Sequence, residues 1–190
     1  MTAIIISFPP GAGGNHLKNI ISADISFLKE LDLYKHKTVH KVPGGNLKKQ
    51  QVDYAVNNPC LLNFLHGHFG EIMSYQYQIR DIVDKKFIII CPDTAEDHEL
   101  LRTRQQRLGF SYYPRSGEYF EGEQVFLYEP FMYHHYFNVP MENIMNIPIT
   151  EWFVEDISPV VHRLNFFLKT NLDVDSVNEM HRIWYRNNFK

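Results

Sequence analysis

The sequence predicts an α/β fold in which helices cover both faces of a central, mostly parallel sheet of about four to five strands, a three-layer αβα arrangement. Short apolar, β-branched runs alternate along the chain with longer segments whose apolar residues recur at helical spacing. The runs are apolar throughout, which is typical of strands buried on both faces of a parallel sheet. Residues 1–190 show no repeat, low-complexity segment or linker, and we therefore expect one domain.

Four runs carry the strand pattern. The first reads Ala-Ile-Ile-Ile-Ser and is bounded by Pro9 and Pro10, and the cleanest reads Lys-Phe-Ile-Ile-Ile-Cys and stops at Pro92. Because the first run is apolar on both faces, we expect it to be central in the sheet. The four predicted strands are residues 3–7, 60–65, 86–91 and 143–149.

Helical spacing fills most of the chain between and after these strands. Asp93 or Thr94 can cap the helix that follows the third strand. In the helix before that strand, Ile79, Ile82 and Val83 are expected on one apolar side. The glycine- and tyrosine-containing stretch 109–122 is expected to be a long loop. One predicted helix begins near Asn15. The others cover residues 46–57, 70–84, 94–108, 123–137 with an interruption at Pro130, 157–168 and 174–187.

Composition limits the class of protein. Apolar residues make up 44% and charged residues 22%, which is ordinary globular usage. The net charge of −3 is not that of a general nucleic-acid binder, which usually has a basic face. We expect no membrane partner and a cytoplasmic location, because no run could cross a bilayer and no signal peptide is visible. Cys60 and Cys91 lack metal-ligand spacing and are interpreted as buried small apolar residues in a reducing compartment.

A proline- and glycine-rich loop joins the first strand to the first helix. Glycines let the backbone wrap so tightly that several N–H groups converge on one anion, and the positive end of the following helix adds to the attraction. Phosphate or sulfate is the expected ligand, and a tight turn that needs its glycines only for packing is the alternative. The residues expected to bind a nucleotide here are Pro10, Gly11, Ala12, Gly13, Gly14, Asn15, His16 and Leu17.

The loop does not carry an intact Walker A motif, which reads G-x-x-x-x-G-K-[ST]. If Gly13 is the second glycine, Phe8 stands in place of the first. Gly14 then replaces the lysine, and Asn15 replaces the serine or threonine. An ATPase or an ordinary kinase needs that lysine on the β/γ-phosphates and that hydroxyl on magnesium, so both activities are disfavoured.

Two stretches of the chain follow another known pattern. Pro10, Gly13 and Leu17 match in register a loop of proline, lysine, serine, glycine, threonine, threonine, any residue and leucine. Residues 144–172 run from a strand through an acidic corner into a proline-started helix and an apolar tail. Both stretches resemble the sulfotransferase family of P-loop nucleotide-binding proteins. The residues that carry the C-terminal part of the resemblance are Glu151, Pro159, His181 and Trp184.

The resemblance implies a P-loop fold and an enzyme that moves a sulfuryl group from phosphoadenosine phosphosulfate to a small-molecule acceptor, without a metal. His66 and His68 follow the second strand, where the family places a histidine, and either is a candidate base for the acceptor proton. The sequence departs from the family at two places. Gly11 replaces the loop lysine, and the arginine with which the family grips the 3′-phosphate of the nucleotide is missing after the third strand. Arg102 and Arg104 are candidates to replace that arginine.

Other side chains have a functional and an ordinary interpretation. His16 is a candidate donor to the anion and a third candidate catalytic residue, or it packs outward at the helix start. Lys18 is a candidate cation, although a solvated lysine is the simpler interpretation. His134 and its aromatic neighbours line an acceptor pocket or belong to the core, and Arg115 is a candidate lid residue.

Three functions remain open at this point. The first is the sulfotransferase-like enzyme. The second is a nucleotide or nucleoside kinase-like enzyme, because Gly11-Ala12-Gly13 resembles the loop of nucleotide kinases. The third is a non-catalytic relative that binds a nucleotide as a sensor or interaction module. The acceptor is not given by the sequence.

Overall fold

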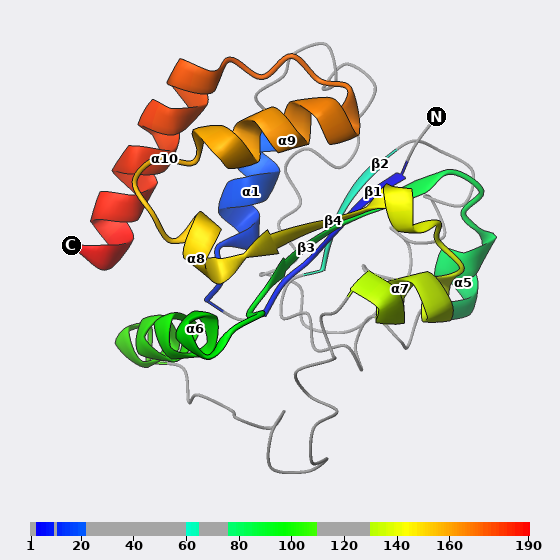
Figure 1. The fold of residues 1–190 in the computed structure, drawn as a ribbon, viewed down its shortest axis with the longest axis horizontal. Coiled ribbons are helices and arrows are strands. Elements are labelled where there is room, and N and C mark those ends of the chain that lie inside the picture. The colour runs from blue at the N-terminus through cyan, green and yellow to red at the C-terminus, as the bar shows by residue number, and fades with distance from the viewer. Residues whose placement is uncertain (1–2, 10, 22–59, 65–75, 110–129) are drawn as a thin grey trace.

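The computed structural model has an α/β fold built on a parallel sheet (Figure 1). It describes residues 3–9, 11–21, 60–64, 76–109 and 130–190. In this part of the chain the sheet has four strands in the order β2-β1-β3-β4, and all neighbours are parallel. The α/β class and the four predicted strands are confirmed. The strands are β1 (Ala3–Ser7), β2 (Cys60–Phe64), β3 (Lys85–Cys91) and β4 (Ile144–Pro148).

Helices connect these strands and continue after the last one. None of the helices in the described ranges is both long and apolar enough to span a membrane. The helices are α1 (Gly14–Ile21), α5 (Gln76–Asp81), α6 (Ala95–Arg107), α7 (Pro130–Phe137), the 3-10 turn η3 (Met141–Asn143), α8 (Ile149–Trp152), α9 (Ser158–Leu168) and α10 (Val174–Phe189).

The helices cover both faces of the sheet. On one face the ring of Phe87 packs against Tyr133 of α7, whose hydroxyl hydrogen-bonds to Ser7 Oγ at 2.7 Å. Successive side chains of a strand point to opposite faces, so Lys86 points the other way, and its Nζ donates to the carbonyl oxygen of Phe167 in α9. Figure 1 shows α1 with α9 and α10 on one side of the sheet and α5 with α7 on the other.

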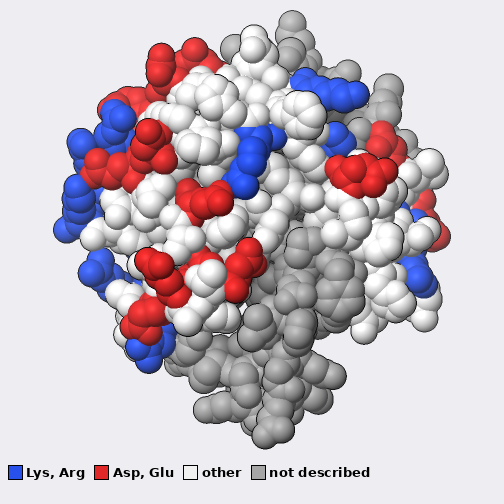
Figure 2. All heavy atoms as spheres, in the orientation of Figure 1, with Lys and Arg blue, Asp and Glu red and all other residues white. Residues whose placement is uncertain are grey.

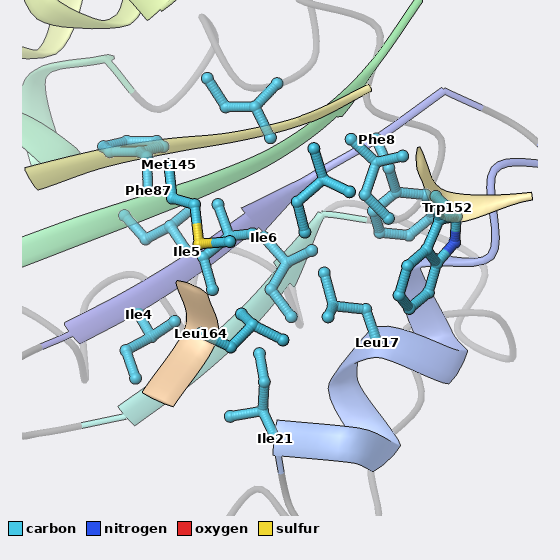
Figure 3. Packing of buried hydrophobic residues seen from close by; sticks show 14 of the residues in the cluster. Ile4, Ile5, Ile6, Phe8, Leu17, Ile21, Phe87, Met145, Trp152 and Leu164 are labelled. Atoms are coloured by element: carbon cyan, nitrogen blue, oxygen red, sulfur yellow. The ribbon is translucent and has the colours of Figure 1, made fainter. Parts of the chain in front are cut away.

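The core lies on both sides of β1 and β3. Every residue of β1 is buried, as expected for a central strand, and Ile88, Ile89 and Ile90 of β3 are fully buried as well. Figure 3 shows Leu17 and Ile21 of α1 and Leu164 of α9 pointing toward the strands. Burial of this kind is the main stabilising contribution in a domain of this size.

One detail differs from the sequence-based prediction. Val83 is 96% exposed rather than on the apolar side of a helix, because α5 ends at Asp81 and helical spacing no longer applies in the turn before β3. Pro130 is the first described residue of α7, so the interruption predicted there stays a prediction. The predictions for residues 46–57, 70–75, 110–122 and 123–129 lie outside the described residues.

Candidate anion-binding site

The strand order places a switch point between β1 and β3. The chain leaves β1 toward β2 on one side, but it leaves β3 toward β4 on the other side. Right-handed crossovers then put the connecting helices on opposite faces, and a crevice opens at the carboxyl ends of the two strands. Open α/β sheets bind their ligands in this crevice. The loop after β1 and the turn after β3 therefore form the candidate site.

Two positive φ angles shape the backbone after β1. Gly11 and Gly13 have φ angles of 81° and 80°, whereas Ala12 between them is not among the described positive-φ residues. Alternation of left- and right-handed residues is typical of a concave anion-binding nest, in which consecutive N–H groups face one side, and residues 11–14 are called the nest below. The N–H of Ala12 already donates to the carbonyl oxygen of Pro9 at 3.1 Å and is not available to an anion. The carbonyl oxygen of Gly13 accepts the first hydrogen bonds of α1, from the N–H groups of His16 and Leu17, so the nest leads directly into a helix N-terminus.

Aromatic side chains fill the space behind the nest. A Cβ atom added to Gly13 would lie 2.6 Å from Cζ2 of Trp184 and 3.2 Å from Nε1 of Trp152. Nε1 of Trp152 donates to the carbonyl oxygen of Ala12 at 2.8 Å. A Cβ atom on Gly14 would lie 2.1 Å from the ring of Phe8. Gly13 is thus required by close packing as well as by φ, and Gly14 by close packing alone. Figure 3 shows Phe8 and Trp152 at this end of the sheet.

His16 belongs to this aromatic cluster. Its ring stacks on Trp184 with centroids 4.5 Å apart, and its Nε2 lies 3.2 Å from Nδ1 of His181. Burial, together with the neighbouring imidazole of His181, lowers the pKa of His16 to about 3. Burial likewise lowers the pKa of His181 to about 4, although its hydrogen bond to the carbonyl oxygen of Val154 opposes the shift. Both rings are therefore neutral at pH 7, and this placement favours a packing role for His16 over the catalytic one.

The two candidate arginines have different surroundings. The side-chain stem of Arg104 lies against the loop, since a Cβ atom on Gly11 would be 3.7 Å from its Cγ. Both terminal nitrogens of Arg104 donate to Asn188 in α10, and its buried Nε has no partner among the described residues. Arg102 lies on the exposed side of α6, where it pairs with Glu99 at 2.5 Å. The structure brings Arg104 to the loop and does not bring Arg102 there.

A buried carboxylate ties together the strand ends on the other side of the crevice. Oδ2 of Asp97 accepts hydrogen bonds from the backbone N–H groups of Asp93 and Thr94, and Oδ1 accepts from the N–H of Thr150 at 2.5 Å. Burial alone would raise the pKa of Asp97, but these hydrogen bonds outweigh it and lower the pKa. Thr94 is the N-cap of α6, and Asp97 completes a capping box with it.

The end of β3 also carries a small polar cluster. The buried thiol of Cys91 donates to Oδ1 of Asp93 at 2.7 Å or to Oδ1 of Asn146 at 2.6 Å, and Nδ2 of Asn146 donates to Oδ2 of Asp93 at 2.7 Å. Burial, followed by the hydrogen bond to Asp93, raises the pKa of Cys91. The thiol is therefore protonated and unreactive at pH 7, as predicted for a buried small side chain.

The remaining candidates are divided between the core, the surface and undescribed segments. Lys18 is buried, which corrects the prediction of a solvated lysine, and burial lowers its pKa. In α7 Tyr133 is buried whereas His134 and His135 are exposed, so this helix contributes aromatic side chains to the core. The positions outside the described residues are Pro10, His66, His68 and Arg115.

No large patch of one charge is visible on the face drawn in Figure 2. Acidic and basic residues alternate along the edge formed by α10, where Arg182 pairs with Glu179 and both Arg186 and Lys190 pair with Glu155. Within the described ranges no three His, Cys, Asp or Glu side chains lie close enough to hold a metal ion.

No protein-family model matches this chain, and no curated protein matches it. The geometry of the loop and of its neighbours therefore carries the functional argument.

Sequence reasoning did not single out Trp152 or Asn188 as parts of the site. One signal for Trp152 was present, because the chain contains two tryptophans and one of them directly follows the acidic corner after β4. The contact of each residue with the loop or with Arg104 depends on the tertiary fold, and no local pattern indicates it.

Proposed function

We propose that this chain binds a phosphate- or sulfate-bearing nucleotide at the loop after β1 and acts as a sulfotransferase-like, P-loop enzyme. The positive φ angles of Gly11 and Gly13 carry this proposal, because a glycine-rich turn of this kind at a helix N-terminus is typical of anion-binding loops. The switch point of the sheet supports it, since the nest lies at the crevice where such sheets bind ligands.

The chain holds the anion chiefly with its backbone. The positive end of α1 and the N–H groups of the nest supply the attraction. The stem of Arg104 lies beside Gly11, but its guanidinium is held by Asn188 and lies over the ring of Phe189. Arg104 could replace the lysine that Gly11 replaces only if its guanidinium moved toward the loop.

Phosphoadenosine phosphosulfate, when bound, supplies the sulfuryl group and a leaving phosphate. The loop would orient that phosphate and stabilise the negative charge that develops on it. A base must take the proton of the acceptor hydroxyl or amine, and His66 and His68 remain the candidates. They follow β2 in the sequence, and β2 ends beside β1 at the same edge of the sheet.

A kinase-like phosphoryl transfer is the second candidate. The exposed carboxylate of Asp93 and the amide of Asn146 lie together at the carboxyl end of β3 and β4, and oxygen ligands of this kind suit Mg²⁺. One oxygen of Asp93 already accepts from Nδ2 of Asn146, and the other lies within hydrogen-bond distance of the Cys91 thiol, which makes this the weaker proposal. A relative that binds a nucleotide without turnover is the third.

A thermal-shift titration separates the first two functions, and turnover with an acceptor separates the enzyme from a relative that only binds. Adenosine 3′,5′-bisphosphate and ATP are each added with and without magnesium, because a ligand that binds only the native state raises the melting temperature. Stabilisation by the bisphosphate without magnesium is the expected result and would justify a screen for sulfuryl acceptors. Stabilisation only by ATP with magnesium would favour the kinase, and no shift from either ligand would refute nucleotide binding.

A further inference from the structure

The last helix contacts the anion loop at both of its positive-φ glycines. At Gly13 the contact is direct, since the ring of Trp184 occupies the space that a side chain would need. At Gly11 it passes through Arg104, whose stem lies on the glycine and whose guanidinium is held by Asn188. Nδ2 of Asn188 donates in turn to the carbonyl oxygen of Trp184, which joins the two contacts within α10.

A chain of hydrogen bonds fixes the orientation of the His16 and His181 rings, which both contact the ring of Trp184. Nε2 of His181 donates to the carbonyl oxygen of Val154 at 2.8 Å, which leaves Nδ1 of His181 as an acceptor. Nε2 of His16 then donates to that Nδ1, and the orientation of the His16 ring is set. The His16 ring is almost parallel to the ring of Trp184, with 3° between their planes. The ring of Trp184 therefore packs on a His16 ring whose orientation is fixed by His181.

We propose that Trp184 is the positioning residue of the anion loop, so that docking of α10 and binding of an anion are coupled. The inference rests on the proposed function. Glycine is the most flexible residue, so fixing a glycine-rich loop in one conformation costs conformational entropy, and contacts with the surrounding structure must offset that cost. The Trp184 ring does so by closing the space behind Gly13, and anion binding must stabilise α10 by the same free energy with which α10 favours the anion.

The test compares three variants in the full chain. Trp184→Ala removes the ring, and Trp184→Phe keeps a smaller aromatic ring as the conservative replacement. Val177→Ala is the matched control, because Val177 is buried in the same helix and is not among the nearest atoms to either loop glycine. Each variant is measured for amide hydrogen exchange at His16 and Leu17, whose N–H groups bond to Gly13, and for its Kd for adenosine 3′,5′-bisphosphate.

We expect Trp184→Ala to speed exchange at both amides and to raise the Kd about tenfold, within the usual range of coupling between sites. Trp184→Phe should restore most of both properties, whereas Val177→Ala should lower the melting temperature and leave the Kd unchanged. An unchanged Kd and unchanged exchange in folded Trp184→Ala would overturn the proposal. If Trp184→Ala does not fold, a Kd in Trp184→Phe equal to that of the wild type would do so.

The two proposals fail in different ways. If the wild-type protein does not bind the bisphosphate, the proposed function fails, and exchange in the ligand-free variants still decides whether Trp184 positions the loop. If the wild type binds and the Trp184 variants bind equally well, the positioning role fails and the proposed function stands.

Discussion

Replacement of Gly13 by alanine tests the positive φ of this residue and its close contact with Trp184. Two effects should lower the free energy of unfolding. The φ of 80° is unfavourable for any residue with a Cβ atom, by about 1–2 kcal/mol. The new Cβ would also lie 2.6 Å from the ring of Trp184, and overpacking of this kind costs about 1–3 kcal/mol. Gly13→Ala should therefore lower the free energy of unfolding by about 2–5 kcal/mol.

Gly109→Ala is a matched control for this substitution. Gly109 also has a positive φ, 69°, but a Cβ atom there would meet none of the described residues within 4 Å. It should lose only the backbone part, about 1–2 kcal/mol. The difference between the two variants then isolates the contact with Trp184, and urea unfolding curves measure it.

A double-mutant cycle identifies the group that the new methyl meets. In a Trp184→Ala background, Gly13→Ala should cost no more than Gly109→Ala, because the ring is gone. Equal losses for Gly13→Ala and Gly109→Ala in the wild-type background would refute the reasoning. The result also bears on Gly13→Val, a substitution that the sequence alone suggests as a selective probe of anion binding, since the structure indicates that it would displace α10 as well.

Three further predictions concern the surroundings of the loop. His16 and His181 have pKa values below the ordinary 6.5, so the unfolded chain binds more protons, and stability that is present above pH 6.5 is lost as the pH falls toward 4 and 3. Between pH 7 and pH 5 each histidine should lower the free energy of unfolding by about 2 kcal/mol. In His16→Gln the decrease measured by urea unfolding should be smaller by about that amount. An equal decrease in the variant and the wild type would contradict a buried, neutral His16 ring. Asp97→Ala should lower the free energy of unfolding by about 3 kcal/mol, because it removes the capping box and the hydrogen bond to Thr150. The control Glu96→Gln, at an exposed neighbouring position, should lower it by about 0.5 kcal/mol or less. Similar losses in the two variants would show that the contacts of Asp97 do not stabilise the fold. Tyr133→Phe should lower the free energy of unfolding by about 1–3 kcal/mol, because it removes the hydrogen-bond partner of the buried Ser7 hydroxyl. Adding Ser7→Ala should recover part of this loss. Additive losses in the double variant would argue against a hydrogen bond between the two side chains.

The sheet could be predicted from the sequence because its signals are local. Each strand is a short apolar run that stops at a polar or proline residue, as the run before Pro92 does. The cap at Thr94 was predictable for the same reason, since a side chain that bonds three residues ahead leaves a short pattern. The position of the loop between a buried strand and a helix was local as well, and the glycines indicated that its backbone turns tightly.

The surroundings of the loop could not be predicted, because they come from distant parts of the chain. His16 and His181 are 165 residues apart and share a hydrogen bond that no spacing rule predicts. Lys18 looked solvated because the sequence around it carries no local signal of its burial. Arg104 looked like its neighbour Arg102, and only the position of Asn188 distinguishes the two.

The central claim is that the backbone of residues 11–14 binds an anion, and the amide signals of the glycines test it most directly. The chain has ten glycines, so a sample labelled with ¹⁵N at glycine alone gives a simple spectrum that single substitutions can assign. On titration with adenosine 3′,5′-bisphosphate, the signals of Gly11, Gly13 and Gly14 should move together and saturate, while that of Gly109 stays in place. Binding seen by thermal shift without movement of these three signals would place the ligand elsewhere and contradict the account.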